Sequence, residues 1–304
     1  MRPQTALGPL GQDEAPRTLA SVREARRLRH LRIGALGHAE LDALARDFAA
    51  AQPFPHVVIP DMLAAAPADV LPNFPPLDAP CWRHLGEAYQ DGKMTLSNIA
   101  DIAEPLASIL RELMEPAGLR FVERVSGIRG LVADPYLQGA GLHCTAAGGS
   151  MAPHTDSHLN ERLGIYRRVN VLLYLNPTWD EADGGCLELY DTSDVHTPVR
   201  TVVPRWGTLV LFRSDARSVH GFAKPIVGPG RARRSLAVYY YTAADAPDFA
   251  GYALTHWWTH DPYWGRYGGS ALRRRARLQV YRALRFGSKA LAYLAHRARP
   301  RALP

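Results

Sequence analysis

Residues 169–212 read VNVLLYLNPTWDEADGGCLELYDTSDVHTPVRTVVPRWGTLVLF, and this stretch decides the fold class. Short runs rich in Val, Leu, Thr and Tyr alternate in it with clusters of Gly, Pro, Asn and Asp, which are typical of strands and of turns respectively. We expect strands at 169–175, 186–190, 199–203 and 208–212. Many short strands at roughly even spacing predict a β-sandwich or a jelly roll.

The same strand-rich texture begins near residue 118 and ends with another expected strand at 235–242. Before it, apolar residues recur three and four positions apart, which predicts helices. We expect these helices at 19–33, 41–48, 61–70 and 99–114, and a short strand at 57–59. Pro105 marks either a kink or a new first turn. The pattern is helical again from Gly269 onward, so we expect a β core that N-terminal helices buttress, followed by a C-terminal helix.

The charge of the chain is concentrated at its two ends. The chain has 304 residues, 47% of them hydrophobic, which is enough for a full-sized core, and a net charge of +7. Residues 271–304 hold ten Lys or Arg and no acid, and residues 1–34 hold seven Arg against three acids. Residues 35–270 therefore carry 19 basic and 26 acidic side chains, a net charge of −7. This distribution excludes a uniformly basic protein that coats nucleic acid, and we expect no nucleic-acid partner.

Location and cysteine chemistry follow from what the sequence lacks. No run of about 18 apolar residues occurs, so we expect no transmembrane helix. The N-terminus has no secretory apolar region, so we expect the protein in the cytoplasm.

The chain has three cysteines, Cys81, Cys144 and Cys186. They lie far apart without C-x-x-C spacing, which predicts free thiols rather than disulfides or zinc ligands.

Three segments carry side chains suited to metal chemistry. Alternate residues of an extended chain share a face, so His154 and Asp156 can point into one cavity. His220 follows the expected strand at 208–212. Two imidazoles and one carboxylate leave other metal positions open, which suits non-haem Fe(II) chemistry with oxygen. Arg233, just before the strand at 235–242, can bind a dicarboxylate through bidentate pairing.

Taken in order, His154-x-Asp156, His220 and Arg233-x-Ser235 resemble the Fe(II)/2-oxoglutarate-dependent oxygenases, in particular their prolyl-4-hydroxylase-like branch. The resemblance runs over about residues 120–245. It includes the segment between the two metal-binding strands, at Tyr174-Leu175-Asn176, Trp179 and residues 184–190 (GGCLELY).

The resemblance implies a double-stranded β-helix, which is a jelly roll. It implies that His154, Asp156 and His220 hold Fe(II) and form the catalytic centre. It also implies that Arg233, Ser235 and Tyr174 bind the distal carboxylate of 2-oxoglutarate.

The reaction of this family consumes 2-oxoglutarate and O2, with ascorbate as the expected reductant, and releases succinate and carbon dioxide. An unactivated carbon of the substrate is hydroxylated. Related halogenases have a small residue at the position of Asp156, so its presence favours hydroxylation, although desaturation or ring formation could use the same site.

We expect three parts in the chain. Residues 1–50 form a flexible N-terminus with basic helices, residues 51–250 form the dioxygenase domain with its catalytic core at 120–245, and residues 251–304 form an aromatic segment and a basic helical extension. The expected substrate is a small molecule or a carrier-tethered biosynthetic intermediate. The alternatives are a prolyl residue of a protein and, third, a non-catalytic sensor of metal or 2-oxoglutarate.

Several residues near these motifs keep two interpretations. His158 is a loop histidine or projects toward the substrate mouth. Arg167 and Arg168 are expected in solvent, with contact to an anionic substrate as the alternative. Arg234 is expected to point away from the cavity, unless a shift of one residue exchanges it with Arg233.

The C-terminal part also keeps alternatives. The aromatic residues between 256 and 264 form a lid or substrate wall, or else pack in the core. The basic C-terminal helix is solvated, or it docks on the acidic body, on a partner or on an anionic surface.

Overall fold

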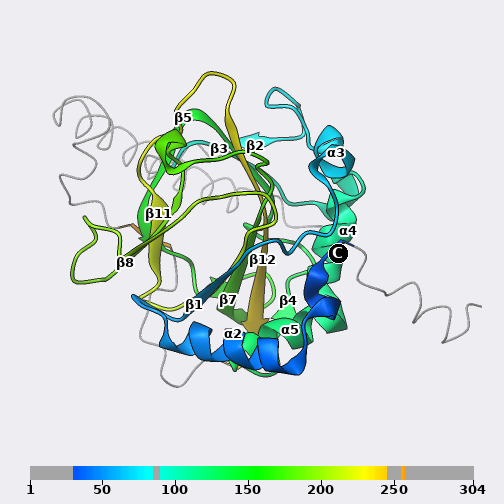
Figure 1. The fold of residues 1–304 in the computed structure, drawn as a ribbon, viewed down its shortest axis with the longest axis vertical. Helices are drawn as coiled ribbons and strands as arrows, with labels where there is room; N and C mark the ends of the chain where they lie inside the picture. The colour runs from blue at the N-terminus through cyan, green and yellow to red at the C-terminus, as the bar shows by residue number, and fades with distance from the viewer. Residues whose placement is uncertain (1–29, 85–89, 245–254, 258–304) are drawn as a thin grey trace, which may run out of the picture.

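The computed structural model describes residues 30–84, 90–244 and 255–257. Thirteen strands in these residues form one antiparallel sheet, whose main path runs in the order β1-β10-β7-β12-β5-β11-β8-β9 (Figure 1). The strands are β1 (His56–Ile59), β2 (Arg83–His84), β3 (Gln90–Leu96), β4 (Val132–Ala133), β5 (Gly141–Thr155), β6 (Leu159–Asn160), β7 (Ile165–Tyr174), β8 (Leu187–Tyr190), β9 (Arg200–Val202), β10 (Leu209–Arg213), β11 (Val219–Phe222), β12 (Ala232–Thr242) and β13 (His256–Trp257). This topology is mainly β and agrees with the double-stranded β-helix implied by the sequence.

The longest strand, β5, belongs to both layers of the jelly roll. Its residues 141–146 pair with β12, whereas its residues 151–154 pair with β11. Between these two parts the pairing with β3 shifts register, because Lys93 lies opposite Thr145 while Asp91 lies opposite Ser150. A bulge of this kind bends a strand, and here it carries β5 from one layer to the other.

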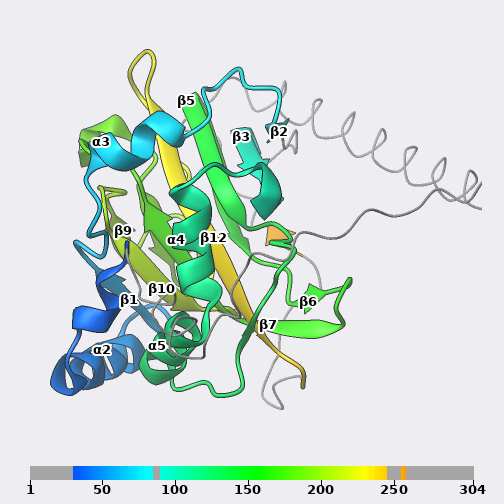
Figure 2. The ribbon, with the colours of Figure 1, turned by 90° about the vertical axis from the view of Figure 1, so that its right-hand side faces the viewer.

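The helices lie on the outside of the layer that contains β7 and β12 (Figure 2). They are α2 (His38–Ala50), α3 (Pro67–Val70), α4 (Leu106–Met114) and α5 (Pro116–Ser126). Short 3-10 turns occur at η1 (Arg32–Ala35), η2 (Leu71–Asn73), η3 (Ile99–Asp101) and η4 (Glu181–Asp183), and η4 lies in the loop before β8, where Lys224 donates to Glu181 O. The hydroxyl of Tyr240 in β12 donates a hydrogen bond of 2.9 Å to the carbonyl oxygen of Leu113 in α4. Leu110 and Leu113 are fully buried, so this outer face forms the main hydrophobic core.

The structure confirms the five strands expected between 169 and 242, the strand at 57–59 and the helix at 41–48. The helix expected at 61–70 is reduced to the single turn of α3. The helix expected at 99–114 is divided, because Pro105 is the N-cap of α4 and η3 precedes it. Most of the helix expected at 19–33 and everything after Gly269, including the basic C-terminal helix, lie outside the described residues.

Two strands that matter for the site are not among those that the apolar texture of the sequence predicts. They are β3 and β5, and they are polar or rich in Gly and Ala, so their sequences lack the apolar texture of the other strands. None of the helices in the described part of the chain is long and apolar enough to cross a membrane. The three cysteines are free thiols, as predicted.

Candidate metal centre

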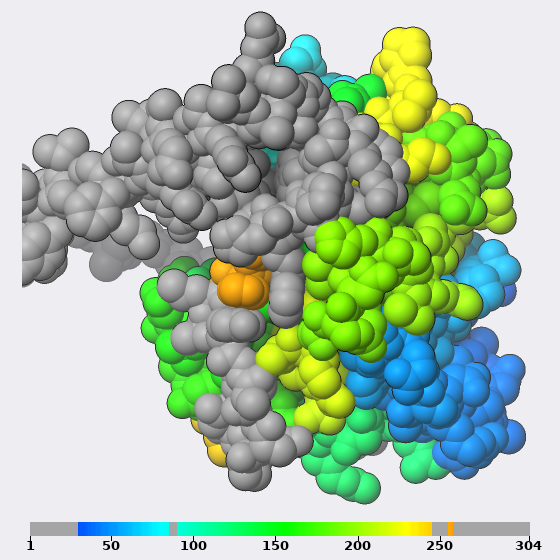
Figure 3. Space-filling model, turned by 90° about the vertical axis from the view of Figure 1, so that its left-hand side faces the viewer, coloured from blue at the N-terminus to red at the C-terminus, as the bar shows by residue number. Residues whose placement is uncertain are grey.

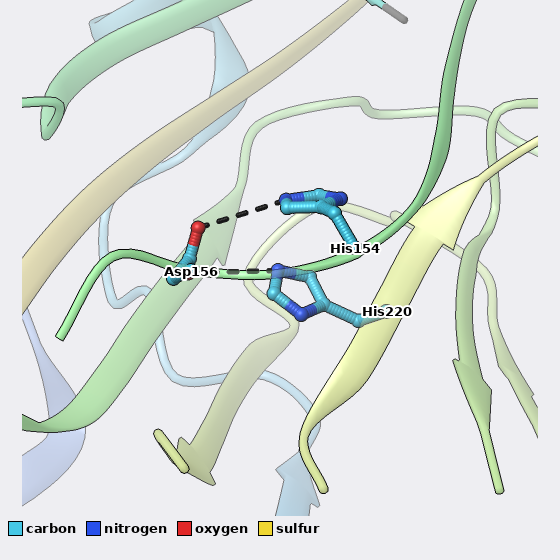
Figure 4. A group of neighbouring side chains, drawn as sticks. All are labelled: His154, Asp156 and His220. Carbon is cyan, nitrogen blue, oxygen red and sulfur yellow. Dashed lines mark ion pairs between the residues drawn. The ribbon is translucent and has the colours of Figure 1, made fainter. Parts of the chain in front are cut away.

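The structure brings His154, Asp156 and His220 together in the interior of the jelly roll (Figure 4). His154 lies near the end of β5, Asp156 follows that strand, and His220 lies in β11 directly opposite His154. Residues directly opposite in an antiparallel pair project to the same face, so both imidazoles reach one point. Gly221 allows the two strands to come this close, because a Cβ atom there would meet the carbonyl oxygen of Ala152 at 2.9 Å.

The donor atoms of the three side chains face one another. Asp156 Oδ1 is 3.6 Å from His154 Nε2, and Asp156 Oδ2 is 3.7 Å from His220 Nε2. The other ring nitrogen of each histidine is bonded to a backbone carbonyl, since His154 Nδ1 lies 2.9 Å from Ala152 O and His220 Nδ1 lies 2.9 Å from Ser218 O. With Nδ1 as the donor, each imidazole presents the lone pair of Nε2 to the cluster.

The pKa values of His220 and Asp156 are both shifted toward the charge state in which these side chains bind a divalent cation. Burial, with the nearby His154, lowers the pKa of His220 to about 4, so this imidazole is neutral at pH 7. Burial by itself raises the pKa of Asp156, but Arg167 and the two imidazoles outweigh it and hold the pKa well below its usual range. Two imidazoles and one carboxylate with donor atoms within 4.8 Å of one another fit a three-ligand metal site.

Arg233 lines the same cavity as the three residues. The Arg233 side chain is buried, its Nη2 donates to the Tyr174 hydroxyl at 3.0 Å, and its Nε donates to Gly185 O at 2.6 Å. The guanidinium also lies over the Phe222 ring, 4.5 Å from its centroid. These contacts fix the orientation of a cation whose five donors suit a carboxylate.

Ser235 and Tyr174 are buried directly opposite each other in the β12–β7 pair. Tyr174 contacts Arg233, but neither Ser235 nor Tyr174 is among the residues that line the cavity. Arg234 projects to the opposite face of β12, where its guanidinium lies 5.6 Å from the centroid of the Phe74 ring. The prediction that Arg233 points inward and Arg234 outward is therefore confirmed.

The prediction that Arg167 is solvated is wrong. Arg167 is only 6% exposed, and its Nη1 lies 3.2 Å from Asp156 Oδ2. The strand β7 already includes Arg167, and its pairing with β12 shifts register between Val169 and Arg167. This irregularity interrupts the alternation of the strand, so Arg167 shares the inward face with Asn170 instead of entering solvent. Arg168, on the other face, is half-buried and donates to the hydroxyl of Thr242 at 3.3 Å.

Three further polar residues of the cavity were not found from the sequence: Lys93, Asn170 and Tyr239. His143 lines the cavity with them. Lys93 lies on the unexpected strand β3, and burial together with Lys93 keeps the pKa of His143 well below its usual value. Asn170 does carry a sequence signal, because it is a polar residue in the middle of the apolar run 169–175. A buried polar residue in such a run requires a hydrogen-bond partner.

Within the described residues, the aromatic segment that begins at His256 contacts the three candidate ligands through Trp257. Trp257 in β13 pairs with His154 in β5, and the two rings stack with centroids 4.6 Å apart. Residues 255–257 are orange in Figure 3 and reach the surface that this view shows. His158 is buried against Tyr166 in the loop after β5 and is not among the residues that line the cavity. The remaining aromatic residues up to 264 lie outside the described residues.

Several known proteins are similar to parts of this chain in sequence. A family model described as the 2OG-Fe(II) oxygenase superfamily matches residues 140–241. Prolyl 3-hydroxylase OGFOD1 of Mus musculus is 31% identical over 144 residues, which cover 45% of this chain and 24% of that protein. Prolyl 3-hydroxylase OGFOD1 of Xenopus laevis is 36% identical over 78 residues, which cover 25% of this chain and 15% of that protein. The chain therefore spans less than a quarter of the length of these two relatives.

Two solved structures are also similar. A prolyl hydroxylase of Trichoplax adhaerens, in complex with a peptide fragment of the hypoxia inducible factor oxygen degradation domain, has a TM-score of 0.48 at 20% identity; the match covers 74% of this chain and 94% of that one. A prolyl-4-hydroxylase of Pseudomonas putida has a TM-score of 0.44 at 21% identity; the match covers 66% of this chain and 98% of that one.

Proposed function

We propose that the chain is an Fe(II)- and 2-oxoglutarate-dependent oxygenase, because residues 140–241 match the model of the 2OG-Fe(II) oxygenase superfamily and parts of the chain are similar to prolyl hydroxylases. In this proposal it hydroxylates a carbon atom of its substrate while it converts 2-oxoglutarate and O2 to succinate and carbon dioxide. One observation carries this proposal. A carboxylate and two imidazoles suited to Fe(II) share a cavity with a buried arginine suited to a carboxylate.

In this proposal His154, Asp156 and His220 hold the iron, which when bound supplies the oxygen-activating redox chemistry. The protein contributes two imidazoles with fixed ring orientations, because each Nδ1 is bonded to a backbone carbonyl. It also contributes a carboxylate that is ionised at neutral pH. The surrounding apolar residues, among them Leu172 and Phe222, limit the access of water to the reacting atoms.

Arg233 binds the distal carboxylate of 2-oxoglutarate in this proposal. The Tyr174 hydroxyl accepts a hydrogen bond from Arg233, so its own proton can be donated to the same carboxylate. Burial raises the pKa of Tyr174, which keeps the hydroxyl protonated and able to donate. Ser235, on the same face of β12 as Arg233, is the third residue assigned to this end of the cosubstrate.

The substrate we propose is a prolyl residue of a peptide or protein. The sequence matches to prolyl hydroxylases favour this alternative over the small-molecule or carrier-tethered substrate that we expected first from the sequence.

The cellular location is a separate question, and a location in the cytoplasm stays a prediction from the sequence.

The first test is succinate formation by the purified chain with Fe(II), ascorbate, 2-oxoglutarate and air. The His154→Ala variant is the negative control, and the variant His84→Ala is the matched control, because His84 is exposed on β2. We expect succinate from the wild type and from His84→Ala, and none from His154→Ala.

Substrate class is tested by adding proline-containing peptides or, separately, free proline and other small molecules. Stimulated succinate formation, with one oxygen atom added to the peptide by mass spectrometry, supports prolyl hydroxylation. Stimulation by small molecules alone would restore the first expectation. Binding of metal and 2-oxoglutarate without turnover on any candidate would favour a sensor, and the absence of both bindings would reject the proposal.

A further inference from the structure

Two side chains of β7, Arg167 and Asn170, hold the same oxygen atom of Asp156. Asn170 Nδ2 donates to Asp156 Oδ2 at 2.5 Å, and Arg167 Nη1 lies 3.2 Å from the same oxygen. Asn170 is 1% exposed and Arg167 is 6% exposed, so both contacts are made away from solvent. Hydrogen bonds to an ionised group in such an environment are stronger than those between neutral groups.

Both side chains are fixed by the centre of the sheet. Asn170 lies directly opposite Tyr239 of β12 on one side and Phe212 of β10 on the other. The guanidinium of Arg167 lies over the Tyr239 ring at 4.0 Å, and the Arg167 backbone N–H donates to His158 O at 2.6 Å. Asp156, in contrast, lies beyond the end of β5, so it depends on these neighbours for its orientation.

The donor and acceptor atoms of Asp156, Asn170 and Arg167 determine which hydrogen bonds these side chains can form. An ionised carboxylate only accepts hydrogen bonds, so Asn170 must turn its amide nitrogen toward Asp156. Arg167 has donors only and stays charged. Both oxygens of Asp156 lie near an imidazole, Oδ1 at 3.6 Å from His154 Nε2 and Oδ2 at 3.7 Å from His220 Nε2. They differ in their donors, because Oδ2 receives both donors from β7 and Oδ1 receives neither, so the lone pairs of Oδ1 stay available to a metal.

We propose that Arg167 and Asn170 are positioning residues that restrict Asp156 to one metal-binding oxygen, Oδ1. The inference rests on the proposed function, because it concerns the metal that the three ligands would hold. A carboxylate that bound through both oxygens would occupy one of the positions that this class of site leaves open for cosubstrate and O2. Partners that hold a ligand in this way contribute about 10- to 100-fold to metal affinity.

The experiment measures binding of Mn(II) alone, without 2-oxoglutarate, by equilibrium dialysis of the full chain. The variants are Asn170→Leu and Arg167→Met, together with the conservative variant Arg167→Lys. The matched control is Arg168→Met, which removes the adjacent arginine on the opposite face of β7. We expect about 10- to 100-fold weaker binding for Asn170→Leu and Arg167→Met, an intermediate loss for Arg167→Lys, and a change of less than about twofold for Arg168→Met.

The visible absorption spectrum of bound Co(II) gives a readout that a purely structural role would not change. Release of Oδ2 toward the metal alters the coordination number, so we expect the bands of the Asn170→Leu and Arg167→Met proteins to shift relative to wild type and to Arg168→Met. Thermal unfolding in EDTA shows that each variant is folded at the temperature of the binding measurement.

The possible failures are distinguishable. Wild-type affinity and spectrum in both Asn170→Leu and Arg167→Met overturn the positioning role and leave the proposed function intact. A wild-type chain that binds Mn(II) and depends on these residues, but forms no succinate with any substrate, overturns the proposed function alone. A wild-type chain that binds no Mn(II) overturns both.

Discussion

The two layers of the jelly roll carry different functional side chains, and α4 packs against the outer face of one of them. The long-strand layer, which we define as β7, β12 and residues 141–146 of β5, has α4 against its outer face and carries Arg167, Asn170 and Arg233 on its inner face. The short-strand layer, which we define as β8, β9, β11 and residues 151–155 of β5, carries His154 and His220. In the long-strand layer stability and binding are therefore assigned to opposite faces, and substitutions can separate them.

The largest effect is expected in the short-strand layer. His220→Ala removes one of the three proposed metal ligands, so we expect succinate formation to fall by at least about 100-fold. This fall is larger than the one expected when a residue that only orients a ligand is replaced. The measurement is the initial rate at saturating 2-oxoglutarate, with His84→Ala as the control. A variant that keeps one tenth of the rate would show that His220 is not a ligand.

The outer face of the long-strand layer is expected to affect stability alone. Leu110→Ala in α4 empties a fully buried site and should lower the free energy of unfolding by about 2–5 kcal/mol. Urea unfolding measures this loss, and Mn(II) affinity of the folded variant at low temperature should stay within about twofold of wild type. A large loss of affinity would mean that the two faces of this layer are coupled.

Substitutions of Arg233 and of Arg234 test the two faces of the strand β12 against each other. If Arg233 binds 2-oxoglutarate as proposed, Arg233→Met removes charge-assisted hydrogen bonds worth about 1.5–3 kcal/mol and should raise the Kd for 2-oxoglutarate by about 10- to 100-fold. Arg234→Met removes a contact with Phe74 on the outer face and should leave this Kd unchanged. Isothermal titration in the presence of Mn(II) measures both, and equal effects would contradict the assignment of Arg233.

The smallest expected effect is a difference in the rates at which iodoacetamide labels the three native thiols. Burial raises the pKa of Cys144 and of Cys186 to about 11, whereas Cys81 is exposed. At pH 8 the two buried thiols therefore have little thiolate, and iodoacetamide should label Cys81 first. Cys144 lies in the main core, so it should react more slowly than Cys186. Mass spectrometry of timed samples checks this order, and the reverse order would show that the long-strand layer opens more readily.

The candidate ligands, which the structure brings together, could be selected from the sequence because their signal is local. His154 and Asp156 are two positions apart, Arg233 opens an apolar strand, and the order of these residues with His220 matches one family. The strands with apolar texture were predicted for the same reason.

What the sequence did not predict depends on contacts between distant residues. The strand β5 contains Gly148 and Gly149 at the bulge, so its role in joining the two layers has no periodic signal. Arg167 was expected in solvent because an arginine before an apolar run is usually exposed, and its burial becomes favourable only where Asp156 supplies the opposite charge. Lys93 lines the cavity only because β3 pairs with β5, and this contact between distant segments has no local signal in the sequence.

The pairing of β11 with the end of β5 also has a consequence for folding kinetics. Sixty-four positions separate Asp156 from His220, so the third donor joins the first two only after a long loop has closed. During synthesis the ribosome releases the His154–Asp156 pair well before His220. A nascent chain therefore has a two-donor site at most, and tight retention of a metal ion has to wait until the strands of both layers have assembled.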